Sequence, residues 1–148
     1  QLVRGRRLRL QRTEPNIGAL ATALADPVNP VTAQYHLAFV ASDTFYEHTH
    51  RYPGQRHDWQ ADVDPLLSHA QTYCARIGLD LSDSDRVRLQ HACYELTRGA
   101  HSDTPSTAAY LGGVAAQEVI KILTVQYIPL DNTCVYDGIV QAVSSFRL

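Results

Sequence analysis

Residues 110–121 read Tyr-Leu-Gly-Gly-Val-Ala-Ala-Gln-Glu-Val-Ile-Lys, and this stretch decides the fold class. Gly112 and Gly113 stand early in a helical pattern, where each glycine costs about 1 kcal/mol relative to alanine. With the nearby alanines they form a small-residue face, which lets another element pack close to the helix axis. Glu118 can pair with Lys121 three residues later, so the pattern predicts a tightly packed helix with one polar edge.

The residues on either side of this helix predict an α/β layer. Thr104 and Pro105 supply an N-cap and a proline at the first helical position. After the helix come β-rich runs at 127–130, 133–136 and 139–143, and the pair Asp137-Gly138 stands between the last two. Because an Asp-Gly pair between two such runs is a strong hairpin signal, we expect a hairpin there. A helix that leads into short strands is typical of the end of an α/β layer.

Upstream of residue 100 the pattern is helical. Three helices are predicted: one from Val31 to an end near His48 to His50, one from Val63 to Ile77, and one that follows Ser82 or Ser84 and ends before Gly99. Their inward positions are Val31, Tyr35, Ala38, Phe39, Ser42 and Phe45; Val63, Leu66, Leu67, Ala70, Cys74 and Ile77; and Leu89, Ala92, Cys93 and Leu96. We therefore predict two parts, a mainly helical segment over 1–100 and a helix with strands over 101–148.

Composition excludes several classes of protein. The chain has 148 residues, of which 45% are hydrophobic and 19% charged, so it is too apolar to be disordered. No apolar run is long enough for a membrane span, and no signal-peptide pattern opens the chain. Three scattered cysteines favour a reducing compartment over a disulfide framework. The chain begins with Gln1 and contains no Met, so we expect a processed chain or a fragment of a longer protein.

An arginine cluster marks the first dozen residues. Arg4, Arg6, Arg7, Arg9 and Arg12 alternate with Leu and Val. One interpretation is a basic arm that binds nucleic acid, and the other is the solvent-facing side of a helix. The second is favoured because no aromatic residues are interleaved for base stacking and the net charge is −2.

Candidate chemical groups do not form a recognised motif. The histidines, His48, His50 and His57 among them, lack the cysteine or carboxylate spacing of a metal site and are interpreted as surface residues. Cys74 and Cys93 fall on inward helix positions, so they are interpreted as core thiols. There is no glycine-rich dinucleotide loop, P-loop or nucleophile elbow.

A family resemblance does emerge from the last third of the chain. The pattern Pro105-x-x-Ala108, Gly112-Gly113-x-x-Ala116-Gln117-Glu118-x-x-Lys121, Gln126-Tyr127-x-Pro129, Asn132 and Tyr136-x-Gly138 resembles the closing segment of ubiquitin-like-protein activating enzymes, relatives of the bacterial MoeB/ThiF adenylating proteins. Within that superfamily, Phe45-Tyr46, Arg51-Tyr52-Pro53-Gly54 and the ending Ser144-Ser145-Phe146-Arg147-Leu148 are similar to the regulatory subunit of the neddylation activating enzyme. The resemblance covers residues 31–148 closely and residues 1–30 more loosely.

The resemblance implies a scaffold without chemistry of its own. It implies that residues 1–100 end a domain of the catalytic-cysteine type and that 101–148 return into a Rossmann-like ThiF/MoeB adenylation fold. The implied partners are the catalytic subunit of a heterodimer, which holds ATP, magnesium and the thioester cysteine, and a ubiquitin-like modifier; nucleic acid and membrane are not expected. This fragment would bind no cofactor and supply no catalytic residue, and the protein would reside in cytoplasm and nucleus.

The same resemblance supplies the candidate site residues. They match the family helix and are expected to pack near the partner interface: Gly112, Gly113, Ala116, Gln117, Glu118 and Lys121. Three alternatives stay open at this point: the regulatory subunit of the SUMO-activating enzyme, a basic-armed helical nucleic-acid-binding module, and a standalone adenylating enzyme.

Overall fold

The computed structural model describes residues 16–25, 30–100, 102, 104–130 and 132–147. It is mainly helical, with a small antiparallel sheet of two strands, β1 and β2, among the described residues. The helices are α1 (Ile17–Leu24), α2 (Pro30–Thr49), α3 (Val63–Arg76), α4 (Asp83–Arg98) and α5 (Pro105–Thr124), with a 3-10 helix, η1 (Trp59–Asp62), before α3. The strands are β1 (Thr133–Asp137) and β2 (Ala142–Phe146). This arrangement is consistent with the expected α/β fragment.

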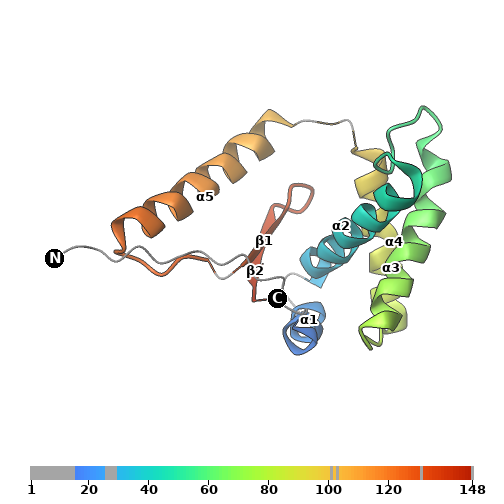
Figure 1. Ribbon diagram of the computed structural model, residues 1–148, viewed down its shortest axis with the longest axis horizontal. Coiled ribbons are helices and arrows are strands. Elements are labelled where there is room, and N and C mark those ends of the chain that lie inside the picture. The colour runs from blue at the N-terminus through green and yellow to red at the C-terminus, as the bar shows by residue number, and fades with distance from the viewer. Residues whose placement is uncertain (1–15, 26–29, 101, 103, 131, 148) are drawn as a thin grey trace.

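Helix α2 is the centre of the core. It packs against α1, α3, α4 and β1, and Figure 1 shows it between the α3–α4 pair and the hairpin. Its buried side chains include Leu37 and Phe45, which meet Leu66 of α3 and Leu89 of α4 in one apolar cluster. Complete burial of a Leu or Phe side chain contributes about 1.5–3 kcal/mol, so this cluster is the main source of stability among the described elements.

The predicted caps of the bundle helices are confirmed. The hydroxyl of Ser82 accepts a hydrogen bond from the backbone N–H of Asp85, which fixes the start of α4, and Gly99 follows its end. Gly78, just after α3, has φ +72°, a left-handed conformation that glycine adopts without a steric penalty. Helix α2 ends at Thr49, as expected ahead of Pro53-Gly54.

The loop between α2 and α3 is fastened to the end of α4. The carboxylate of Asp62 accepts hydrogen bonds from both terminal nitrogens of Arg51 at 2.5 Å and from the Gly54 N–H at 2.9 Å. Gly54 has φ +82°, and a Cβ built on it would lie 2.0 Å from the Thr97 carbonyl oxygen. The close approach of two backbones therefore requires glycine at this position.

The hairpin differs from the prediction. The strands pair with Asp137 opposite Ala142, so residues 138–141 form a four-residue turn in place of a two-residue Asp-Gly connection. The Asp137 carboxylate accepts hydrogen bonds from the N–H groups of Ile139 and Val140, and this contact closes the longer turn. The run at 139–143 is thus mostly turn, and the second strand begins at Ala142. Residues 127–130 are not a strand either.

Two further expectations require correction. Phe39 was predicted to face inward with Ala38, Ser42 and Phe45. Those three residues are buried, but Phe39 is 51% exposed, because the buried side of α2 also includes Leu37 and Ala41 and turns away from Phe39. Helix α1 was not predicted; the Asn16 side chain caps it by accepting a hydrogen bond from the Ala19 N–H at 3.0 Å. The arginine cluster at 4–12 and the side chain of Val31 lie outside the described residues. None of the helices described is long and apolar enough to cross a membrane.

Candidate functional site

Helix α5 is the most exposed helix of the described chain. It contains no buried residue, and Figure 1 shows it standing away from the α2–α4 bundle beyond a short connection. Its composition is nevertheless apolar over almost its whole length. A helix with so broad an apolar surface is normally buried in a larger protein or assembly. The helix therefore presents a candidate interface.

One face of α5 lies against the hairpin. The rings of Tyr110 and Tyr136 stack with centroids 4.6 Å apart. The Glu118 carboxylate accepts hydrogen bonds from Lys121 Nζ at 2.6 Å and from the Leu130 N–H at 2.7 Å. These bonds hold the pKa of the Glu118 carboxyl below its ordinary value, with the Lys121 contact as the larger cause. Glu118 thus ties the chain after α5 back onto the helix, as the predicted Glu118–Lys121 pair allows.

The opposite face of α5 is open and carries no charge. We call it the α5 outer face; it consists of Ala109, Gly112, Gly113, Ala116, Ile120 and Leu123. These positions recur at helical spacing, and all of them are exposed. A Cβ added at either glycine would meet no atom within 4 Å outside its own helix, so the face can admit an external backbone.

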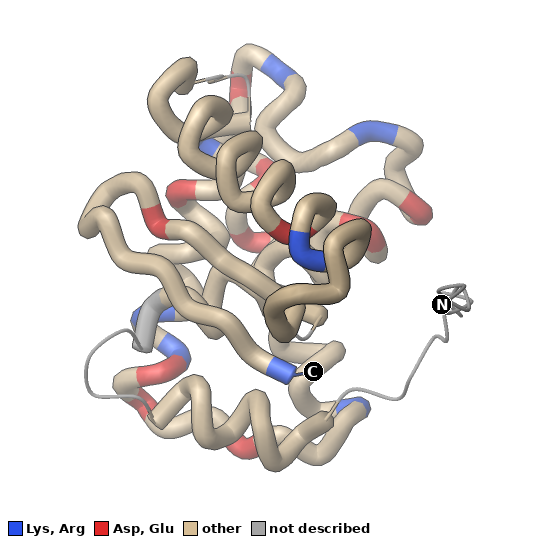
Figure 2. Tube along the Cα trace, turned by 90° about the vertical axis from the view of Figure 1, so that its left-hand side faces the viewer, with Lys and Arg blue, Asp and Glu red and all other residues tan. Residues whose placement is uncertain are grey.

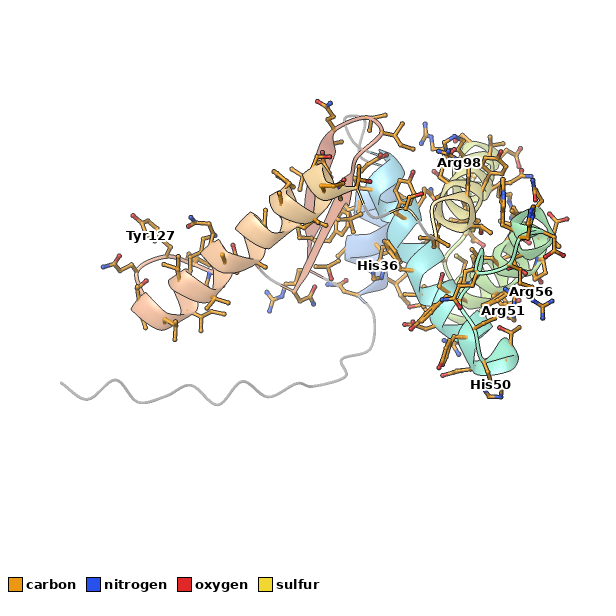
Figure 3. The ribbon with its side chains drawn as sticks, turned by 90° about the horizontal axis from the view of Figure 1, so that it is seen from above. His36, His50, Arg51, Arg56, Arg98 and Tyr127 are labelled. Carbon is orange, nitrogen blue, oxygen red and sulfur yellow. The ribbon has the colours of Figure 1, made fainter. Side chains whose placement is uncertain are left out.

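The segment after α5 continues the apolar surface. Val125 ends the helix in a left-handed conformation at φ 56°, which is unusual for a β-branched residue. Tyr127 is 72% exposed and Ile128 is 91% exposed, and Figure 3 shows Tyr127 at the end of α5 farthest from the bundle. The sequence places Tyr127 in the family pattern and both residues in a β-rich run, but neither side chain was predicted to lie on an exposed apolar surface; the absence of a charged residue over 122–130 was the available signal.

The candidate residues fall on different faces. Gly112, Gly113 and Ala116 lie on the α5 outer face and Gln117 is exposed, whereas Glu118 and Lys121 face the hairpin side. The structure contains no partner, so a role for these residues in an interface stays a prediction. Figure 2 shows how few residues along the chain are coloured as Lys or Arg. Within α5 the positive charge is that of Lys121, which pairs with Glu118.

The cysteines occupy the predicted positions. Cys74 and Cys93 are buried, and Cys134 lies half-buried in β1. Burial raises the pKa of the Cys74 thiol to about 11 and that of Cys93 to about 12. Since the thiolate is the nucleophile, both thiols are protonated and unreactive near neutral pH.

The described side chains were compared with the requirements of a metal site and of a phosphate-binding loop. No group of three His, Cys, Asp or Glu residues there could hold a metal ion. His48 and His69 lie with ring centroids 5.1 Å apart, without a third ligand. Gly112 and Gly113 lie inside α5, where their N–H groups bond within the helix, so they cannot cradle a phosphate as a glycine-rich loop does.

Comparison with known proteins identifies relatives over most of the chain. The chain is 32% identical over 114 residues to the NEDD8-activating enzyme E1 regulatory subunit of Gallus gallus, which covers 76% of this chain and 20% of that protein. It is 33% identical over 114 residues to the corresponding subunit of Drosophila melanogaster, covering 77% of this chain and 21% of that protein. The subunit AXR1 of Arabidopsis thaliana is 27% identical over 139 residues, covering 94% of this chain and 25% of that protein.

These matches confirm the expected relationship. No family model matches the chain. The chain spans about a fifth to a quarter of the length of these curated relatives. Several relatives from animals and a plant nevertheless agree in name and cover most of the chain. The chain therefore belongs to the family of NEDD8-activating enzyme E1 regulatory subunits.

Proposed function

We propose that this chain is part of the scaffold subunit of a heterodimeric neddylation activating enzyme and that the α5 outer face is one of its packing surfaces. The observation that carries the proposal is the uncharged stripe of small residues on a helix with no buried side chain. Small residues let a second element approach closely, and an apolar face of this size costs free energy while it is in contact with water. The names of the relatives supply the kind of assembly.

In this proposal the chemistry belongs to the partner subunit. That subunit would use ATP and magnesium to adenylate the C-terminus of a ubiquitin-like modifier and then hold the modifier as a thioester. No group of three His, Cys, Asp or Glu residues among the described ones could hold a metal ion, and Cys74 and Cys93 are buried and protonated. The chain would therefore act by holding the partner in its active arrangement.

The proposal extends to the parent fold. Helix α5 and the hairpin would be the closing elements of a Rossmann-like ThiF/MoeB adenylation fold, and the helices before residue 100 would end a domain of the catalytic-cysteine type. A sheet of only two strands is marginally stable alone, which agrees with a hairpin that belongs to a larger sheet. The protein would act in the cytoplasm and nucleus.

The relatives favour neddylation over the SUMO alternative, because the matched subunits are named for NEDD8 activation. The nucleic-acid alternative rests on Arg4–Arg12, which lie outside the described residues. No observation from the described residues favours it.

Co-expression tests the proposal directly. The parent subunit that contains this chain would be expressed with the catalytic subunit, and both the mass of the complex and the ATP-dependent thioester with the modifier would be measured. We expect a stable heterodimer and thioester formation that depends on both subunits. A monomeric parent subunit, together with undiminished thioester formation in its absence, would exclude a scaffold role.

A further inference from the structure

A second exposed surface lies on α2, far from the α5 outer face. Phe39, Asp43, Tyr46 and His50 follow one another at intervals of four, three and four residues, so they share one side of the helix region. Glu47 borders this row, and all five residues are exposed. Figure 3 labels His50 at the C-terminal end of this stretch. We call the row, with Glu47 and the adjoining Tyr52, the α2 outer stripe.

The stripe exposes three aromatic side chains to solvent, although contact with water is unfavourable for their apolar rings. Phe39 is 51% exposed, Tyr46 43% and Tyr52 46%. The rings of Tyr46 and Tyr52 lie 4.8 Å apart between centroids at an interplanar angle of 30°, so they form a preformed aromatic platform. Tyr46 comes from α2 and Tyr52 from the loop that Asp62 fastens, which fixes the platform to the folded bundle.

The charges of the stripe are all of one sign. Asp43 and Glu47 stand four residues apart, where like charges destabilise a helix. Helix α2 contains no Lys or Arg, and neither carboxylate forms an ion pair within the described residues. The nearest guanidinium in sequence, that of Arg51, is bound to Asp62 and lies over the ring of Phe45, 5.1 Å from its centroid.

We propose that the α2 outer stripe is a docking surface for an arginine-rich segment of a partner protein. Arginine matches both features of the surface, because its planar guanidinium stacks on aromatic rings and also binds carboxylates through two parallel hydrogen bonds. Lysine offers a point charge without the planar stack, and an acidic segment would be repelled. This inference goes beyond the scaffold function proposed above and does not depend on it.

Binding of a synthetic probe tests the surface. A fluorescent peptide of four Arg-Leu repeats would be titrated with the 148-residue chain, and its anisotropy would give the dissociation constant. The double variant Asp43→Asn/Glu47→Gln keeps the side-chain shapes and removes both charges. Exposed ion pairs contribute about 0.2–1 kcal/mol each, so the loss of two corresponds to roughly twofold to thirtyfold weaker binding. Tyr46→Gln should weaken binding severalfold by removing half of the aromatic platform.

A control variant and a control peptide distinguish specific binding at the stripe from general charge attraction. Asp80→Asn/Asp83→Asn removes two exposed carboxylates near the opposite end of the bundle and should leave the affinity unchanged. A peptide with Lys in place of Arg should bind several times more weakly. Equal loss in both double variants, or equal binding of the Lys and Arg peptides, would overturn the proposal. Tighter probe binding after deletion of residues 1–12 would also overturn it, because the chain's own arginines would then be the occupant.

Discussion

Replacing Gly54 by alanine tests whether the loop between α2 and α3 is locked onto the end of α4. The new Cβ would lie 2.0 Å from the Thr97 carbonyl oxygen and 2.7 Å from the Ala100 Cβ, and the first of these atoms belongs to backbone that cannot rotate away. The residue also has φ +82°, which disfavours any side chain. The added methyl group is therefore unfavourable for two separate reasons, a steric clash and a strained backbone conformation.

The magnitude follows from these two costs. A left-handed conformation costs a non-glycine residue about 1–2 kcal/mol, and overpacking costs a further 1–3 kcal/mol or so. Gly54→Ala should therefore lower the free energy of unfolding by about 2–5 kcal/mol, a large fraction of the roughly 5–15 kcal/mol that stabilises a domain. Gly78 is the matched control: its φ is +72°, but a Cβ there meets nothing within 4 Å. Gly78→Ala should cost only about 1–2 kcal/mol.

Urea unfolding of the 148-residue chain, followed by circular dichroism at 222 nm (roughly the helical minimum), measures the difference between the two variants. We expect a clearly lower midpoint for Gly54→Ala than for Gly78→Ala. Adding Ala100→Gly to Gly54→Ala removes the 2.7 Å contact and leaves the 2.0 Å contact, so recovery should be partial. If the two single variants differed by less than about 1 kcal/mol, the backbone contact at Thr97 would not limit this loop and the reasoning would be wrong.

Three further changes address the interface, the loop and the thiols. Gly113→Leu should reduce co-purification with the catalytic subunit severalfold while the unfolding midpoint of the free chain stays within error, because none of the described residues packs on that glycine; unchanged assembly would refute the small-face argument. Contact with Arg51 holds the pKa of the Asp62 carboxyl below its ordinary value, so its stabilising contribution is complete above about pH 4 and is lost as pH falls through the folded-state value; Asp62→Asn should flatten this acid limb in urea titrations. Cys74→Ser and Cys93→Ser should each leave modifier thioester formation intact apart from losses of stability, and a thioester lost in one folded variant would contradict the scaffold function.

The helices of the bundle could be predicted because their signals are local. The spacing of Leu66, Ala70 and Cys74 defines one face of α3, and Gly78 marks the end of that helix, without reference to the rest of the chain. Phe39 was assigned to the wrong side because α2 is surrounded by several elements. The buried sector of such a helix depends on where those elements stand, and that position is not encoded in the spacing of α2 alone.

The loop and the turn were harder to predict because each depends on a tertiary contact. The pairing of Arg51 with Asp62 joins residues eleven apart, and the requirement for glycine at 54 arises from the backbone of Thr97. In the hairpin, the Asp137 side chain binds two N–H groups of the turn, so the pair Asp137-Gly138 starts a four-residue turn in place of a tight one. The hairpin itself could be predicted, and its register could not.

The two faces of the helix at 110–121 differ in whether the described structure supplies their packing partners. Its inner face is satisfied internally, through the stacking of Tyr110 on Tyr136 and the bonds of Glu118 to Lys121 and Leu130. Its outer face has the glycines that close packing requires, and no other part of the described structure packs on them. The bundle draws its stability from a core of its own, whereas α5 has no buried residue and must gain most of its stability from contacts outside the described chain. The pattern for close packing could therefore be recognised in the sequence although its packing partner could not, because none of the other described elements covers this face.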